Sequence, residues 1–256
     1  MVSATTWLRR CSVHPMTATQ WLSNPRLGVY LQATSGDHAL ALELYDWNAQ
    51  VASACLRDVG HFEVLVRNRY ADKLSAHDAN WTSASSSLWT LESPPPQPNG
   101  VIQKQRKANR KSKESLTIAH ASLTNPASGH VSIPTSGQVI AELMFGFWQS
   151  LTLPVRDATL WKPILSLAVP GLSRGHVHDR MLKLNRFRNR LAHWEPVFSN
   201  STGLALRLTE FENIFTDIDP DVAAWVGTRS TVLETIDQCP LPALMATPTN
   251  FLGRAL

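Results

Sequence analysis

Residues 186–198 read RFRNRLAHWEPVF, a stretch that combines a helical pattern with two polar residues, Asn189 and His193, at a spacing of four. If the stretch is helical, these two residues lie one turn apart on the same face. Pro196 lacks the N–H that a helix needs and disfavours helical geometry in the residue before it. The helix is therefore expected to end near Trp194, with His193 in its last turn.

Apolar residues through this region recur at steps of three and four, which predicts one buried stripe on a helix. The stripe consists of Val177, Met181, Leu184, Phe187, Leu191 and Trp194. At about 100° per residue, Asn189 and His193 point away from it, and Arg188 lies on its flank. The forked guanidinium of Arg188 suits a phosphate. His193 is thus predicted to lie outside the core of its own helix.

Further segments accompany this motif along the chain. In order, they are RL and YL within 26–31, ALELYDWN at 41–48, EVLVRN at 63–68, ELMFGFW at 142–148 and LW at 160–161. Together with the Arg-Asn-x-x-x-His signature, they resemble the Abi-like (abortive infection) branch of the HEPN helical ribonucleases. The resemblance covers roughly residues 20–240 and is more specific than the short signature alone. It departs at Trp194, where the family usually has a second histidine.

The resemblance implies an all-α, HEPN-like helical bundle that cleaves RNA without a metal ion or another cofactor. The ribose 2′-OH would attack the adjacent phosphate and leave a 2′,3′-cyclic phosphate. His193 would move the proton, Arg188 would stabilise the transition state, and Asn189 would orient the histidine or the phosphate. One chain supplies one such histidine, so a two-fold homodimer is expected. The cellular role implied is phage defence by abortive infection or as a toxin controlled by an RNA or protein antitoxin.

Two other classes of function stay open at this point. The chain could be a catalytically silent helical module that binds RNA, or an interaction subunit that a partner such as an antitoxin controls. The intact set of Arg188, Asn189 and His193 favours the enzyme over both.

The positive charge of the chain is concentrated in one segment. Six cations and no acid lie between positions 104 and 113, and subtracting them from the net charge of +4 leaves −2 for the rest of the chain. Pro-rich and Ser-rich stretches on both sides predict a partly flexible insertion at about 93–137. The segment is either a solvated charge run or an arm that binds RNA phosphates. Its cations are Lys104, Arg106, Lys107, Arg110, Lys111 and Lys113.

Four more residues complete the candidates for RNA contact: Arg186, Arg190, Arg67 and Asn68. The last two belong to a partial repeat of the motif, in which Asp72 occupies the position that histidine would take. Glu63 and Arg67 are one helical turn apart. They form either an ordinary helix pair of a few tenths of a kcal/mol or part of the cleft that contains His193.

The expected organisation is a leader at 1–20, a single domain at 21–240 and a tail at 241–256. Amphipathic patterns predict helices at 40–47, 51–74, 139–151, 157–167, 175–194, 210–215 and 222–237, and no strand signal persists. In the helix at 51–74 the apolar face is Val59, Phe62, Leu65 or Val66, and Tyr70. These helices predict an up-and-down bundle with 51–74 and 175–194 among its central members.

Several classes of site are disfavoured. No Gly-x-Ser-x-Gly elbow, phosphate-binding glycine loop or zinc-ligand spacing is present, and His176 and His178 are interpreted as surface residues at a helix start. Three scattered cysteines indicate reduced thiols, and the absence of a signal or membrane segment predicts a cytoplasmic protein with no membrane contact. The tryptophans predicted to be core are Trp148, Trp161, Trp194 and Trp225.

Overall fold

The computed structural model describes residues 21–90, 100–124, 133–198 and 201–245. Over these ranges the chain is all-helical and contains no strand, which confirms the predicted all-α class. In the same ranges, no helix combines the length and apolar character required to cross a membrane. The expected leader at 1–20 and most of the expected tail lie outside the described residues.

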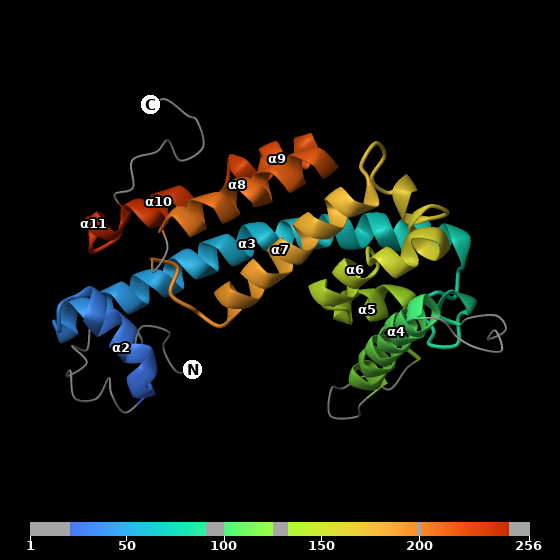
Figure 1. Cartoon of the computed structure of the whole chain (residues 1–256), viewed down its shortest axis with the longest axis horizontal. Coiled ribbons are helices and arrows are strands. Elements are labelled where there is room, and N and C mark those ends of the chain that lie inside the picture. The colour runs from blue at the N-terminus through green and yellow to red at the C-terminus, as the bar shows by residue number, and fades with distance from the viewer. Residues whose placement is uncertain (1–20, 91–99, 125–132, 199–200, 246–256) are drawn as a thin grey trace, which may run out of the picture. The chain divides into compact units, whose positions relative to one another are not determined.

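Figure 1 shows the helical elements in chain order. They are α2 (Asn24–Ala33), α3 (His38–His77), η2 (Ser87–Trp89), α4 (Gly100–Thr124), α5 (Ser136–Glu142), α6 (Phe145–Ser150), η4 (Pro154–Arg156), η5 (Asp157–Trp161), η6 (Leu165–Leu167), α7 (Arg174–Ala192), α8 (Ser201–Ile218), α9 (Pro220–Gly227), α10 (Val232–Asp237) and α11 (Pro242–Met245).

The chain divides into two compact units, each built from segments distant in sequence. Unit 1 consists of Met1–Cys55, Leu191–Leu204 and Thr231–Leu256, and unit 2 consists of Leu56–Arg190 and Ala205–Ser230. Helices α3, α7 and α8 contribute residues to both units.

The core of unit 2 is built on the apolar face of α3. The buried residues of this face are Val59, Phe62, Val66 and Tyr70. The sequence left open whether Leu65 or Val66 belongs to it, and Val66 is the buried one. The Phe62 ring packs edge-on against Phe215 of α8, with 5.4 Å between ring centroids. On the same face, the Tyr70 hydroxyl lies 3.8 Å from the Met181 sulfur of α7.

Helix α7 carries the motif and has the predicted buried stripe. Val177, Met181, Leu184, Phe187 and Leu191 are all buried. The helix ends at Ala192, two residues before the predicted end, because the Trp194 N–H closes a tighter turn on the Leu191 carbonyl at 3.0 Å.

The helix predicted at 139–151 is interrupted, so this prediction was wrong. Leu143 and Met144 are extended, with ψ of 120° and 158°, and separate α5 from α6. The Leu143 carbonyl accepts a hydrogen bond from the Trp148 indole N–H at 3.3 Å, which takes the place of a helical donor. The region 157–167 is likewise a π turn followed by a 3-10 turn, and 222–237 is divided into α9 and α10.

The basic segment is helical, which the sequence analysis did not predict. Residues 104–113 lie inside α4, and α4 packs on η2, α5, α6 and η4 (Figure 1). Over residues 100–124 the expected partly flexible insertion is therefore a packed helix. The breaker-rich flanks at 91–99 and 125–132 lie outside the described residues.

A buried arginine holds α4 against η4. Arg156 is fully buried and donates hydrogen bonds to the Ala108 carbonyl at 2.8 Å and to the Ser112 hydroxyl at 2.7 Å. Its guanidinium also lies over the Trp89 ring, 5.4 Å from the centroid. Nε and Nη1 have no hydrogen-bond acceptor among the described residues, so the π face of the indole is the favourable contact for this side of the charge. Burial lowers the pKa of Arg156 to about 10.

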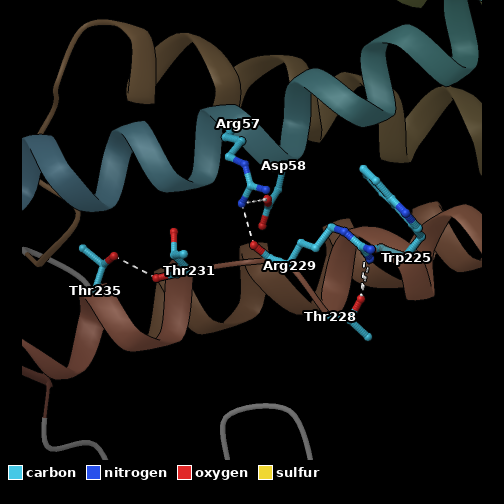
Figure 2. A network of polar contacts seen from close by, with 7 residues as sticks. All are labelled: Arg57, Asp58, Trp225, Thr228, Arg229, Thr231 and Thr235. Carbon is cyan, nitrogen blue, oxygen red and sulfur yellow. Dashed lines mark hydrogen bonds and ion pairs between the residues drawn. The ribbon is translucent and has the colours of Figure 1, made fainter.

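A polar network connects α3 to the chain after α9 in unit 2 (Figure 2). Arg57 donates to the Arg229 carbonyl at 2.6 Å, and the neighbouring Asp58 carboxylate is buried. Burial raises the pKa of Asp58, while a hydrogen bond from the Ser230 side chain and the charges of Arg57 and His61 act in the opposite direction.

The raised pKa of Asp58 predicts a pH dependence of stability. Because the folded carboxyl binds its proton more tightly than the unfolded one, stability contributed by this group falls as the pH rises above the ordinary aspartate value and through the folded pKa. Asp58→Asn should remove that fall. Urea unfolding of both proteins between about pH 4 and pH 7 measures it. A constant difference in unfolding free energy across this range would show that Asp58 is not the titrating group.

Candidate functional site

In unit 2, a glutamate of α3 lies near two of the predicted site arginines. Glu63, Arg67 and Arg188 are all half-buried. Burial raises the pKa of Glu63, and the positive charges of Arg188 and Arg67 and a hydrogen bond from the Phe145 N–H oppose the rise. Phe145 is the first residue of α6, where helical N–H groups have no partner within their own helix. Glu63 is thus more than an ordinary pair with Arg67, because α6 and α7 both contribute to its environment.

The other predicted residues of α3 and α7 are exposed. Asn189 follows Arg188 at the end of α7 and faces solvent, as do Arg186 and Arg190. Asn68 is also exposed on α3. Arg67 and Arg188 thus both act on Glu63, a grouping that the sequence analysis did not predict, and the other four side chains lie on the surface.

His193 belongs to unit 1 and is exposed, as predicted. Its backbone carbonyl accepts a short hydrogen bond from the guanidinium of Arg26 in α2. The next residue, Trp194, is fixed by the turn that ends α7. The main chain at His193 is thus held on both sides while its imidazole faces solvent.

A buried asparagine of α3 holds the chain that follows His193. Asn48 has no exposed surface. Its amide nitrogen lies 3.4 Å from the carbonyl oxygens of Trp194 and Glu195, and its amide oxygen accepts the Val197 N–H at 2.8 Å. Sequence reasoning placed Asn48 only in a flanking segment. The available signal was a polar residue at a core position of an apolar helix pattern.

Two of the four tryptophans predicted to be core are buried and two are not. Trp148 and Trp161 are buried, whereas Trp194 is 39% exposed and Trp225 is 48% exposed. Trp225 makes a cation–π contact, because the Arg229 guanidinium lies 4.4 Å from its ring centroid (Figure 2). Trp194 follows the end of its helix, so the turn removes it from the stripe to which its spacing assigned it.

The basic helix α4 forms one wall of a pocket of about 360 Å³. The other wall is the apolar chain of Leu153, Pro154 and Val155 at η4. Three of the six predicted cations line the pocket, namely Lys104, Lys107 and Lys111. The remaining three are Arg106, Arg110 and Lys113, of which Arg110 pairs with Glu114 at 3.5 Å. Within the basic segment, the pocket lysines are thus the set best placed to receive an anion.

Two histidines at the start of α7 have structural partners. His176 lies 2.8 Å from the Asp217 carboxylate, and His178 lies 2.9 Å from the Thr152 hydroxyl. Both lie near the start of α7, as predicted, and both are half-buried, so they are only partly surface residues. Burial and the charge of Arg174 lower the pKa of His178, and Asp179 raises it.

Two of the three cysteines fall in the described residues. Cys55 and Cys239 are both buried, and Cys11 lies outside these ranges. In the part of the chain that the structure describes, no three His, Cys, Asp or Glu side chains gather in a way that could hold a metal ion.

The role of Asn48 can be tested through stability. Asn48→Ala leaves the Val197 N–H and two carbonyls without their partner, so the free energy of unfolding should fall by about 1–3 kcal/mol. The control is Gln50→Ala in the same helix, whose amide bonds only the exposed Asp46 carboxylate. It should change stability by about 0.5 kcal/mol or less. Equal losses in urea unfolding would contradict the assignment of Asn48 as the clamp.

Compared with models of known protein families, with curated proteins and with solved structures, the chain gives no significant match.

Proposed function

We propose that this protein is a metal-independent endoribonuclease of the HEPN type, with Arg188, Asn189 and His193 as its catalytic residues. The observation that supports the proposal is the partial burial of Arg188 near an opposite charge. This arginine is half-buried beside Glu63 and Arg67 at the end of α7, while the two polar residues that complete the motif are exposed. A half-buried cation and an exposed imidazole are two groups that an internal phosphoryl transfer uses, the first to stabilise negative charge and the second to carry a proton.

The proposed reaction is an internal phosphoryl transfer. The ribose 2′-oxygen attacks the adjacent phosphorus and loses its proton, and the 5′-oxygen leaves and gains one. The products are a 2′,3′-cyclic phosphate and a 5′-hydroxyl. His193 is the only side chain of the motif whose ordinary pKa lies near neutrality, so it serves as the proton carrier. Arg188 stabilises the charge on the transition state, and Asn189 orients His193 or the phosphate.

Glu63 has a positioning role in this proposal. Its carboxylate constrains the Arg188 guanidinium electrostatically, and Arg67 offsets part of the negative charge. We propose that this attraction orients the guanidinium before an RNA phosphate arrives. Preorganised charge is effective because it needs no rearrangement during the reaction.

We also propose a two-fold homodimer. One histidine accepts the 2′-OH proton, and a second from the other copy protonates the 5′-oxygen. The proposed setting is phage defence, in which an RNA or protein antitoxin restrains the enzyme.

A specific observation favours one alternative, a catalytically silent RNA-binding module. Helix α4 presents three lysines in a pocket whose existence does not depend on the motif. In this alternative the chain binds RNA phosphates there and cleaves nothing.

Cleavage in the presence of EDTA tests the enzyme. Purified protein should cut cellular RNA with EDTA present and leave 2′,3′-cyclic phosphate and 5′-hydroxyl ends. His193→Ala should lower the rate by about 10²–10⁴ and Arg188→Ala by about 10²–10³, because each removes a group acting on the transition state. Matched controls are His38→Ala, at the exposed start of α3, and Arg180→Ala, two turns earlier in α7. Circular dichroism should show all four variants folded.

Activity that disappears with EDTA and returns with magnesium would contradict the metal-independent mechanism, and binding without cleavage would favour the silent module.

The contribution of α4 to RNA binding can be separated from cleavage with two triple variants, each of which removes three positive charges. Lys104→Gln, Lys107→Gln and Lys111→Gln together remove the pocket lysines, whereas Arg106→Gln, Arg110→Gln and Lys113→Gln remove the other three cations. Each phosphate contact on single-stranded RNA contributes about 0.7 to the slope of log affinity against log salt, so the pocket triple should lower that slope by about 2. The control triple should lower it less, and single-turnover cleavage at saturating RNA should be unchanged in both. Equal slopes for the two triples would show that α4 acts only as a diffuse charge.

A further inference from the structure

We infer that Trp194, together with Trp21 and Tyr45, forms a stacking platform for an unpaired RNA base beside His193. This inference deepens the proposed ribonuclease function and rests on it for the identity of the ligand. All three aromatic residues and His193 belong to unit 1.

The backbone of Trp194 is the first observation. Its φ is +52°, a left-handed conformation that bulky side chains rarely adopt and that glycine or asparagine adopts at low cost after a helix. Trp194 is held there by the Leu191 carbonyl and by the buried amide of Asn48. Such strain concentrates at functional sites, where the surrounding structure supports it. The turn alone therefore does not explain a tryptophan at this position.

Packing does not explain it either. Trp194 is 39% exposed and meets the ring of Tyr45 edge-on, with 6.2 Å between centroids. Trp225, the other tryptophan wrongly predicted to be core, has the Arg229 guanidinium over its ring. In the described part of the chain, no guanidinium or ammonium covers the ring of Trp194 in this way.

A second exposed indole shares the same support. Trp21 is 59% exposed and also meets Tyr45 edge-on, at 5.6 Å, whereas Tyr45 itself is buried. Tyr45 in turn packs edge-on against the buried Tyr30 at 5.3 Å. The two exposed indoles thus pack on the same buried tyrosine. Their exposed surface is available for contact with a flat ring of a ligand.

The charge beside these rings selects the partner. Trp194 directly follows the exposed His193, and the Arg26 guanidinium bonds the His193 carbonyl. Aromatic rings near the guanidinium of Arg26 suit a ligand that has a flat ring and a negative charge, and a nucleotide of single-stranded RNA has both. Because every base has a π face, stacking tolerates all sequences. The platform should therefore select unpaired RNA and place the adjacent phosphate near His193, with little preference among bases.

The test measures binding and stability separately from cleavage. The probe is a short single-stranded RNA in which fluorine replaces every 2′-hydroxyl, which removes the attacking groups, and a matched probe has an abasic residue at its centre. Trp194→Gly should weaken binding of the intact probe by about 5- to 150-fold, the range expected for one stacked base. The abasic change should weaken wild-type binding by a similar factor and should have little further effect on Trp194→Gly. Trp194→Phe should retain most of the affinity, and Trp225→Ala is the exposed-tryptophan control and should bind normally.

Thermal unfolding separates this effect from a folding defect. Trp194→Gly should stay folded at the assay temperature, because relief of the positive φ offsets part of the packing that is lost at Tyr45. The inference is overturned if wild type does not bind the probe, if Trp194→Gly binds it normally, or if the abasic change weakens both proteins equally. Loss of a dimer by Trp194→Gly in analytical ultracentrifugation, without a change in base dependence, would overturn it by assigning the rings to a contact between copies.

The same data distinguish failure of the proposed enzyme from failure of the platform. If wild type cuts no RNA but binds the probe in a base-dependent and Trp194-dependent manner, the nuclease proposal fails and the stacking site stands. If wild type cuts RNA and Trp194→Gly binds and cuts normally, the enzyme stands and the platform fails.

Discussion

The hydrogen bonds of one buried amide determine the path of the chain after the motif helix. A buried asparagine side chain must satisfy both its donors and its acceptor, and Asn48 does so with three successive parts of the segment 194–197. The segment therefore has one well-defined course past α3. The left-handed turn at Trp194 and the exposure of His193 both follow from this course. Apolar contacts alone would allow the same segment to slide, because they have no direction.

The second constraint is electrostatic and lies in unit 2. A half-buried carboxylate such as Glu63 is costly when charged, and the two arginines and one helix N-terminal N–H reduce the cost. The same attraction acts on the two arginines, so a change at Glu63 removes a negative charge from the surroundings of both guanidinium groups.

The sequence predicted the parts of the fold that depend on periodicity. The stripes on α3 and α7 needed only helical spacing, and both are buried as expected except at Trp194, which follows the end of α7. The errors occurred where tertiary contacts compete with local pattern. The indole of Trp148 bonds the Leu143 carbonyl and divides one predicted helix into α5 and α6. Helix α4 was missed because the proline-rich and serine-rich flanks and the charge run suggested flexibility, whereas its small buried residues pack against η4. The sequence offered Arg188 and Arg67 as candidate site residues, which stays a prediction. It did not offer the clamp by Asn48, because no spacing rule relates an amide to a turn so distant in sequence.

The buried guanidinium of Arg156 has a thermodynamic consequence for α4. Arg156 has no carboxylate partner among the described residues and recovers much of its hydration whenever α4 separates from η4, so the docked state gains less from this contact than an apolar one would provide. The lysine pocket has one wall on each of these elements and exists only while they are docked. An anion that occupies the pocket must therefore shift the equilibrium toward the docked helix. Anion binding in the pocket and docking of α4 on η4 are therefore thermodynamically linked, so each one favours the other.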